Sequence, residues 1–381
     1  MTEVIDLLRD LVRINSVNPD LVPEAAGETA IADFCADWLG RRGFEVVRHE
    51  TTPGRPSIVG IARGSGGGPT LMLNGHTDTV TIAGYDGDAL DARIEHERVW
   101  GRGSGDMKAG VAAMMIAAHR AATEGLCGDI LVACVADEEN GSLGSEEVAA
   151  HYRPDAVIVT EPTDLELIVT HKGFVWFDIT VEGRAAHGSR PEEGIDAIAK
   201  AGRFLLALDE HAQRLLEGER YPRLGTGSVH ASIIRGGEEM SSYPAACTIR
   251  IERRTIPGET PETVRDQLVA LIAQCRAADP LFRATLTQGL ARDPLVDPGP
   301  SEIVRLVEAT AEARLGRKPR CVGTAGWTDS ALFNARGIPS ILFGHTGGGF
   351  HASSEWADIA SVEALADILT ETAVRFCQRR P

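Results

Sequence analysis

Hydrophobic residues recur every three or four positions in two segments near the N-terminus. The first segment runs from Val4 to Val12, and the second runs from Ile31 to Leu39 and is followed by Gly40. This spacing places the apolar side chains on one face of a helix, and a glycine is a common stop signal. The chain is therefore expected to begin with amphipathic helices.

The next segments are short continuous runs of β-branched and aliphatic residues. An Ala- and Met-rich stretch at 107–123 lies among them and is long enough for a crossover helix. Continuous apolar strands separated by helices indicate an α/β fold with a mainly parallel sheet sandwiched by helices. The predicted strands span residues 44–47, 57–62, 70–73, 130–135 and 156–159.

The pattern changes after about His171, because apolar and polar residues alternate from Phe174 to Val181. Alternation is typical of an antiparallel sheet with one solvated face. Past a Pro- and Gly-rich stretch at 293–300 the first pattern returns. We therefore expect an α+β domain inserted into the α/β domain. The predicted boundaries are 1–172 and 290–381 for the α/β domain and 173–289 for the insertion.

Charge and composition narrow the classes of partner. The chain has 381 residues, is 43% hydrophobic and 24% charged, and carries a net charge of −17 with no basic patch. Such a surface repels nucleic-acid phosphates and anionic lipids. No stretch approaches 18 apolar residues, the length that a membrane span needs. A small-molecule ligand is expected, rather than nucleic acid or a membrane.

The seven cysteines are scattered along the chain and include no Cys-x-x-Cys pair. This pattern indicates neither a disulfide framework nor a thiolate zinc site. The N-terminal residues also lack the apolar run of a signal peptide. A reducing compartment, the cytoplasm, is the expected location.

Histidines and carboxylates follow several of the predicted buried strands. The carboxyl ends of strands in an open parallel sheet converge on one crevice, so these residues are expected to lie together. One further carboxylate stands in a glycine-rich turn ahead of the crossover helix. The residues are His76, Asp78, Asp106, Glu138, Glu139, Glu161, His345 and His351.

So many carboxylates in one crevice would repel each other without a cation. Imidazole and carboxylate ligands without thiolate suit zinc, with cobalt or manganese as alternatives. Two such ions bridged by one carboxylate polarise a carbonyl and activate water. The neighbours Glu138 and Glu139 then divide into a ligand and a general base. The sequence predicts a metal-dependent hydrolase.

The order of these motifs resembles the acetylornithine deacetylase / succinyl-diaminopimelate desuccinylase family of co-catalytic zinc hydrolases, which also includes aminoacylases and dipeptidases. The resemblance runs through nearly the whole chain. Its motifs are Gly75-His76-Thr77-Asp78, Gly101-Arg-Gly-Ser-Gly-Asp106-Met-Lys, Asp137-Glu138-Glu139, Glu161-Pro162-Thr163, Gly183-Arg-Ala-Ala-His187 and His351 to Trp356.

The resemblance implies a site for two zinc ions. Asp106 would bridge the two ions. His76 and Glu161 would complete one site, and Glu139 and His351 would complete the other.

The resemblance also implies roles for residues that do not bind metal. Glu138 would be the general base, and Asp78 would orient His76. The inserted domain would act as a lid and dimerisation domain in a homodimer. There, His187 would stabilise the oxyanion in a neighbouring subunit's site, and Arg254 would bind the substrate carboxylate.

The chain departs from the family pattern at places that bear on the substrate. Ser241 stands where many members carry Asn, and His345 places an extra imidazole near the cleft. Arg250 and Arg253 are close enough to Arg254 to be alternatives to it. The expected reaction is removal of an acyl group from an N-acyl amino acid. A metallo-dipeptidase or carboxypeptidase acting on short peptides is the alternative.

Other classes of function have weaker support. The glycine-rich segment 63–68 precedes a predicted strand, so it does not match a nucleotide-binding loop. His96-Glu97 begins like a zinc-peptidase motif, but Trp100 stands where the second histidine belongs, and an exposed strand is expected there. No Gly-x-Ser-x-Gly segment marks a serine hydrolase. A catalytically inactive binding protein would not need the complete ligand and base set.

Overall fold

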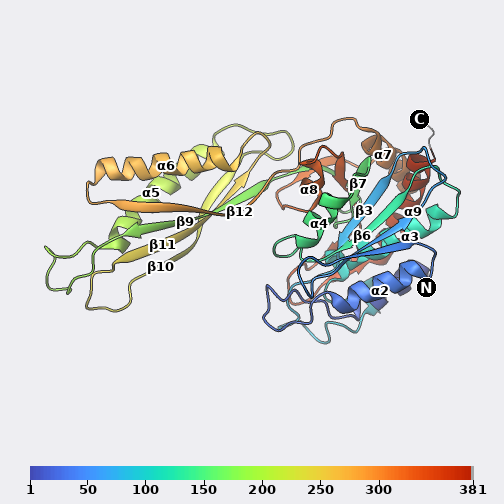
Figure 1. The fold of residues 1–381 in the computed structure, drawn as a ribbon, viewed down its shortest axis with the longest axis horizontal. Helices are drawn as coiled ribbons and strands as arrows, with labels where there is room; N and C mark the ends of the chain where they lie inside the picture. The colour runs from blue at the N-terminus through green and yellow to red at the C-terminus, as the bar shows by residue number, and fades with distance from the viewer. Residues whose placement is uncertain (379–381) are drawn as a thin grey trace. The chain divides into compact units, whose positions relative to one another are not determined.

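The computed structural model describes residues 1–378 and divides into two compact units (Figure 1). The larger unit comprises Met1–Val169, Asp297–Val322 and the chain from Thr328. The smaller unit comprises Thr170–Val296 and Gly323–Trp327. The smaller unit is thus inserted into the chain of the larger one.

An eight-stranded sheet forms the centre of the larger unit. Its strands are β1 (Glu45–His49), β2 (Ser57–Ala62), β3 (Leu71–His76), β6 (Ile130–Val135), β7 (Ala156–Val159), β8 (Leu167–His171), β13 (Cys321–Thr324) and β14 (Ser340–Leu342). Their order is β1-β2-β6-β3-β7-β14-β8-β13. The central run β6-β3-β7-β14 is parallel, whereas β1, β2 and β8 pair in antiparallel fashion.

Helices cover both faces of this sheet. They are α1 (Glu3–Val12), α2 (Thr29–Gly40), α3 (Ala109–Ala122), α4 (Leu143–His151), α7 (Glu302–Leu315), α8 (Ser330–Asn334) and α9 (Ile359–Cys377). Leu71 and Leu73 of β3 belong to the core that contains α3, whereas the next residue, Asn74, donates a hydrogen bond to Ser145 of α4. Successive side chains of a strand point to opposite faces, so α3 and α4 lie on opposite sides.

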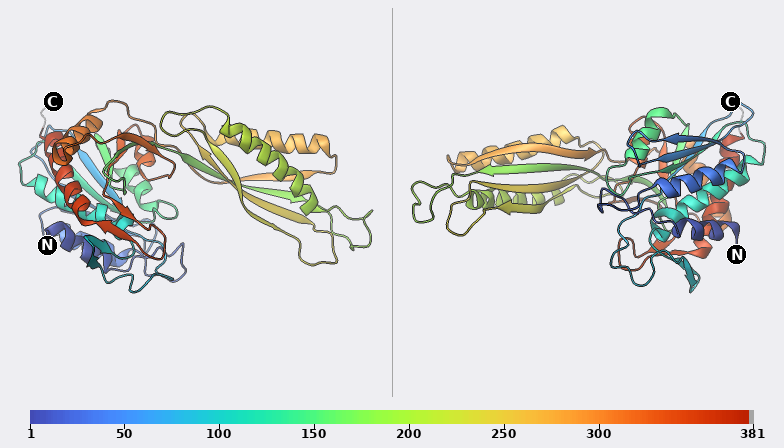
Figure 2. Two further views of the ribbon diagram at one scale, coloured as in Figure 1. Left: turned by 180° about the vertical axis from the view of Figure 1, so that it is seen from behind. Right: turned by 60° about the horizontal axis from the view of Figure 1, so that its bottom comes forward.

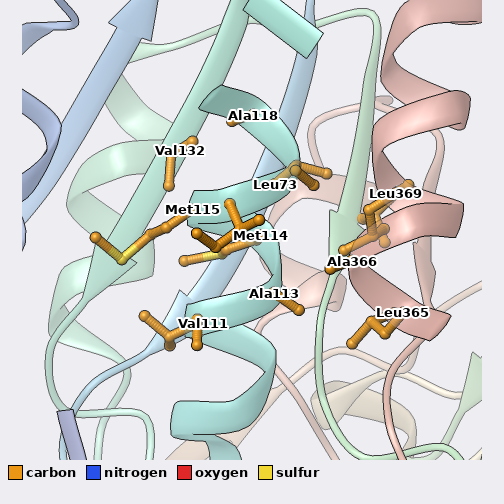
Figure 3. Packing of buried hydrophobic residues seen from close by; sticks show 14 of the residues in the cluster. Leu73, Val111, Ala113, Met114, Met115, Ala118, Val132, Leu365, Ala366 and Leu369 are labelled. Carbon is orange, nitrogen blue, oxygen red and sulfur yellow. The ribbon is translucent and has the colours of Figure 1, made fainter. Parts of the chain in front are cut away.

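The Ala- and Met-rich sequence of α3 suits its central position. Figure 3 shows α3 between the sheet, represented by Leu73 and Val132, and α9, represented by Leu365 and Leu369. Small alanine side chains allow this close approach, and flexible methionines fill the irregular space that remains. The crossover helix predicted at 107–123 is confirmed with slightly shorter bounds.

A second, four-stranded sheet brings two distant loops of the larger unit together. Its strands are β4 (Arg93–Glu95), β5 (Arg98–Trp100), β15 (Gly347–Gly348) and β16 (Trp356–Asp358). β5 pairs with β16, so residues 98–100 lie beside residues 356–358. His96 and Glu97 have φ values of 51° and 59° and form the turn between β4 and β5. The expected strand there is therefore wrong at its first two residues, because the chain reverses at them.

Glu355 connects the same two loops through its carboxylate. Its Oε1 accepts hydrogen bonds from the backbone N–H groups of Gly105 (2.9 Å) and Asp106 (2.8 Å). Its Oε2 accepts from the Gly103 N–H (3.0 Å) and from Arg102 Nη1 (2.8 Å). Both charged side chains are buried, at 1% and 3% exposure. The glycine-rich turn is therefore held by a single buried carboxylate.

The smaller unit is an antiparallel sheet with two helices (Figure 2). Its elements are β9 (Gly173–Glu182), β10 (Ser228–Gly236), β11 (Ala246–Thr255), β12 (Arg283–Arg292), α5 (Ala197–Leu216) and α6 (Pro261–Ala278). α6 begins with a capping box at Thr260 followed by Pro261, as helix starts prefer. Val175, Phe177 and Ile179 of β9 face the core with the helices, and the residues between them are more exposed.

The fold class expected from the sequence is confirmed, with a large sheet that is parallel at its centre and flanked by helices. Within residues 1–378, the structure contains no helix that is both long enough and apolar enough to span a bilayer.

The Glu355 contacts predict a large loss of stability on neutralisation. We expect Glu355→Gln to lower the free energy of unfolding by about 3–5 kcal/mol, because Arg102 would remain as a buried, unpaired charge. The measurement is the midpoint of thermal unfolding by calorimetry, and each kcal/mol corresponds to roughly 2–4 °C. Glu371→Gln is the control, because it removes an exposed ion pair with Arg375. Equal shifts for the two variants would contradict the prediction.

Candidate metal centre

Three neighbouring parallel strands deliver the first group of site residues. His76 is the last residue of β3, Glu138 and Glu139 follow β6, and Glu161 follows β7. β3 lies between β6 and β7, so the carboxyl ends of the three strands are adjacent. The crevice predicted from the strand ends is the place where these residues meet.

Asp106 lies between the two site histidines. Its Oδ1 is 3.2 Å from His76 Nε2, and its Oδ2 is 3.4 Å from His351 Nε2. The peptide bond between Asp106 and Met107 is cis. Each oxygen of the carboxylate thus faces a different imidazole, which is the arrangement that a carboxylate bridging two cations requires.

The other two predicted ligands, Glu161 and Glu139, each lie beside one of the two site histidines. Glu161 Oε1 is 3.7 Å from His76 Nε2, and Glu139 Oε2 is 3.1 Å from His351 Nε2. Ligand atoms of His76, Asp106 and Glu139 lie within 4.8 Å of one another, as do those of His76, Glu138 and Glu161. The structure therefore brings all the predicted metal-binding residues together, with Glu138 beside them.

The electrostatics of the crevice favour a bound cation. Burial raises the pKa of Glu161 to about 8, and the nearby Asp106 carboxylate adds to the shift. Burial also raises the pKa of Glu138 well above its ordinary value. Carboxyl groups respond in this way when negative charges are crowded in a dehydrated place. Imidazole groups lie beside these crowded carboxylates, and both are ligands that divalent metals accept. The residues present therefore fit a divalent metal.

Asp78 controls the orientation of His76. The His76 ring places Nδ1 3.0 Å from the Asp78 carbonyl oxygen and 3.4 Å from its carboxylate Oδ1. A proton on Nδ1 is donated to Asp78, and Nε2, which faces Asp106 and Glu161, is the ring atom that would bind a metal. This is the usual support for a metal-binding histidine.

Asp329 is a further buried carboxylate of the crevice, and the sequence interpretation did not single it out. It is 1% exposed and precedes α8. Burial raises its pKa to about 6, and its negative charge contributes to the raised pKa values of Glu138 and Glu161. An Asp before a helix is a common cap, so the sequence carries no signal that separates this residue from a structural one.

His345 is fully buried, so its imidazole is not open to solvent. Burial lowers its pKa to about 4, which keeps the ring neutral, although Asp106 and Asp358 act in the opposite direction. Its backbone carbonyl accepts hydrogen bonds from Thr163 and Asp164. The extra imidazole therefore belongs to the packed interior of the larger unit.

His187 and Ser241 lie in the smaller unit, in two loops that contact each other. His187 is exposed, and its Nδ1 is 2.8 Å from Ser189 Oγ. The Gly188 N–H donates to the carbonyl oxygen of Ser241 at 2.7 Å, and His187 forms a β-bridge with Ser242. The family position that is changed to Ser241 thus neighbours the predicted histidine.

The three candidate arginines of β11 have different surroundings. Arg253 is 1% exposed and forms an ion pair with Glu259, so its guanidinium is part of the interior. Arg254 points to the other face of the sheet, where its Nη2 is 2.8 Å from Glu252 Oε1. The Arg254 guanidinium also lies 5.3 Å from the centre of the Phe174 ring. Arg250 is exposed on the same face as Arg254.

Curated proteins with similar sequences match this chain over almost its whole length. An acetylornithine deacetylase of Myxococcus xanthus is 29% identical over 377 residues, covering 95% of this chain and 93% of that protein. An acetylornithine deacetylase of Proteus mirabilis is 27% identical over 388 residues, covering 98% and 96%. These proteins confirm the family resemblance.

Solved structures with the same fold carry peptidase names. A tripeptidase of Staphylococcus aureus superposes with a TM-score of 0.81 at 20% identity, covering 99% of this chain and 98% of that one. A metallo-carboxypeptidase of Sulfolobus solfataricus has a TM-score of 0.80 at 15% identity and covers 99% of both chains. The sequence model of peptidase family M20/M25/M40 matches residues 72–375. The chain therefore belongs to peptidase family M20/M25/M40 and is a metal-dependent hydrolase.

Proposed function

We propose that this enzyme hydrolyses the acyl-amide bond of an N-acyl amino acid. The observation that carries the proposal is the arrangement of Asp106 between His76 and His351, with Glu138 beside them. The near full-length acetylornithine deacetylase relatives favour an acyl amino acid as the substrate. Hydrolysis of short peptides is the second candidate, which the peptidase neighbours favour.

Two zinc ions are the proposed cofactors, with Co²⁺ or Mn²⁺ as substitutes. Asp106 would hold both ions, His76 and Glu161 one of them, and Glu139 and His351 the other. A dinuclear metal-binding peptidase of Bacillus subtilis, with a TM-score of 0.74 at 16% identity, has the same fold. When bound, the ions would polarise the amide carbonyl and lower the pKa of water.

Glu138 is the proposed general base. Its carboxylate would take a proton from the attacking water and return it to the leaving amine. Burial raises its pKa well above the ordinary value, and a carboxylate with a raised pKa is a stronger proton acceptor. The neighbouring Glu139 faces His351 and has the separate task of metal binding.

The smaller unit would supply the groups that recognise the substrate. Residues 173–289 are proposed to form a lid and dimerisation domain in a homodimer. His187 would donate a hydrogen bond to the oxyanion in the partner's site, and its exposure leaves the ring available. Arg254 would bind the substrate carboxylate, since its planar guanidinium makes two parallel hydrogen bonds and is always charged.

A cytoplasmic location is proposed for the enzyme. All seven cysteines are free, and five of them lie in the two hydrophobic cores, which a reducing compartment allows. An N-acyl amino acid is also a small metabolite that a cytoplasmic enzyme would meet.

The proposed substrate class is tested by a panel of N-acetyl-, N-succinyl- and N-carbamoyl-amino acids beside dipeptides. We expect at least one acyl amino acid to exceed every dipeptide in kcat/KM by about tenfold or more, which corresponds to ~1.4 kcal/mol of transition-state stabilisation. Hydrolysis should stop on chelation and return with Zn²⁺ or Co²⁺. Faster turnover of dipeptides would establish the second candidate instead.

Removal of the base should affect turnover and leave metal binding intact. We expect Glu138→Gln to lower kcat by about 10²–10⁴-fold, because an amide cannot accept the proton from water. Metal content should stay at the wild-type value, since the proposed ligands are unchanged. Glu124→Gln, at an exposed position of the larger unit, is the control. Unchanged kcat in Glu138→Gln would refute the assignment of the base.

Steady-state kinetics can distinguish whether Arg254 or Arg250 binds the substrate carboxylate. We expect Arg254→Gln to raise KM by about 10–100-fold, because a hydrogen-bonded charge pair contributes about 1.5–3 kcal/mol. Arg250→Gln, on the same exposed face, should leave KM within about twofold, as expected for an exposed ion pair. A larger effect from Arg250 would reverse the assignment.

A further inference from the structure

A buried hydrogen-bonded network lies directly behind the turn that carries Glu138 and Glu139. Two carboxylates of this network, Asp78 and Asp137, are 0% exposed. Asn18 and Arg55 connect them, and Arg55 retains only 7% exposure. Asn18 and Arg55 come from the N-terminal part of the chain, and neither is a metal ligand or a base in the proposed function.

The carboxylate of Asp78 holds the backbone of both glutamates. Its Oδ1 accepts the Glu138 N–H at 3.1 Å, and its Oδ2 accepts the Glu139 N–H at 3.2 Å. The same carboxylate lies 3.4 Å from His76 Nδ1. Any displacement of Asp78 would therefore move a proposed ligand histidine and the backbone of the base at once.

Asn18 bridges the two buried carboxylates with a single amide group. Its Nδ2 donates to Asp78 Oδ2 at 2.8 Å and to Asp137 Oδ1 at 3.0 Å. Its Oδ1 accepts the Asp20 N–H at 2.9 Å, which determines the orientation of the amide. The Asn18 backbone N–H also donates to the Thr79 carbonyl at 2.9 Å. An uncharged double donor joins the carboxylates without adding negative charge, which aspartate could not do.

Arg55 offsets the negative charge at the other end of the network. Its Nη2 is 2.7 Å from Asp137 Oδ1, and its Nε and Nη2 form a two-pronged pair with Glu28 at 2.8 and 2.7 Å. Asp137 has a φ of 70°, and its carbonyl accepts the N–H groups of Gly141 and Ser142. Arg55 thus holds Asp137 in place, and Asp137 forms the turn that leads to Glu138 and Glu139.

We propose that Asn18 and Arg55 are positioning residues for the reaction. They hold Asp78 and Asp137 in place. These two residues in turn keep the Glu139 side chain oriented for metal binding and the Glu138 side chain oriented to act as the base. This inference rests on the proposed function of the same site. It extends the proposed catalytic apparatus to Asn18 and Arg55, which belong neither to the proposed metal ligands nor to the proposed substrate-binding residues.

The test is a titration of metal-free protein with Co²⁺, followed by visible absorption, together with kcat and KM. We expect Asn18→Asp to weaken Co²⁺ binding by about 10–100-fold, to alter the Co²⁺ spectrum and to lower kcat by a similar factor with KM unchanged. The added carboxylate would repel Asp78 and Asp137. Asn15→Asp is the control, because Asn15 acts only as an acceptor for the Val17 N–H.

Variants of Arg55 give a second, independent readout. Arg55→Met should weaken Co²⁺ binding more than Arg55→Lys, because lysine keeps the charge but cannot form the two-pronged pair. Arg63→Met is the control: Arg63 is exposed, pairs with Glu45 and Asp129, and follows β2, whereas Arg55 precedes the same strand. If Arg55→Met does not fold, Asn18→Asp and Arg55→Lys decide the question.

The outcomes separate this inference from the proposed function. Folded Asn18→Asp and Arg55→Lys proteins with wild-type Co²⁺ binding, spectrum and kcat would overturn the inference and leave the function standing. A wild-type chain that neither binds Co²⁺ nor hydrolyses acyl amino acids would overturn both. Weakened binding in these variants, with unchanged binding in the controls, would support the positioning role.

Discussion

The structure depends on one constraint, the concentration of buried negative charge at the carboxyl edge of the parallel strands. Asp106, Glu139 and Glu161 face the two imidazoles there, with further carboxylates beside them. Burial raises the pKa of Glu161 to about 8, so the protein without metal would retain protons that a divalent cation displaces. Burial and the crowding of carboxylates therefore raise the pKa of Glu138 and the pKa of Glu161 for the same physical reason.

Two sets of hydrogen bonds, one centred on the Glu355 carboxylate and one on Asn18 and Arg55, hold this charge in a defined geometry. Glu355 connects the glycine-rich turn of Asp106 to the loop of His351, and the pairing of β5 with β16 brings those loops together. On the other side, Asn18 and Arg55 hold the turn that follows β6. The groups that carry the proposed chemistry are thus supported by residues from both ends of the chain.

Much of the site could be predicted because its chemistry depends on residue type and on strand ends. His76, Glu139 and Glu161 follow apolar strands, and parallel strands bring such residues to one edge. Glu355 and Asn18 could not be found in this way. A buried Glu and an exposed Glu are the same letter in a sequence, and only the partners that surround them, more than 200 residues away for Glu355, distinguish them.

The sequence by itself determined the elements, the α/β class and the donor types, because hydrophobic periodicity and ligand chemistry are local properties. Only the tertiary structure decided which groups are paired. It turned Arg253 into the interior while leaving Arg254 on the other face, and it buried His345 as a neutral imidazole. The physical reason is that burial and charge compensation depend on contacts between segments that are distant along the chain.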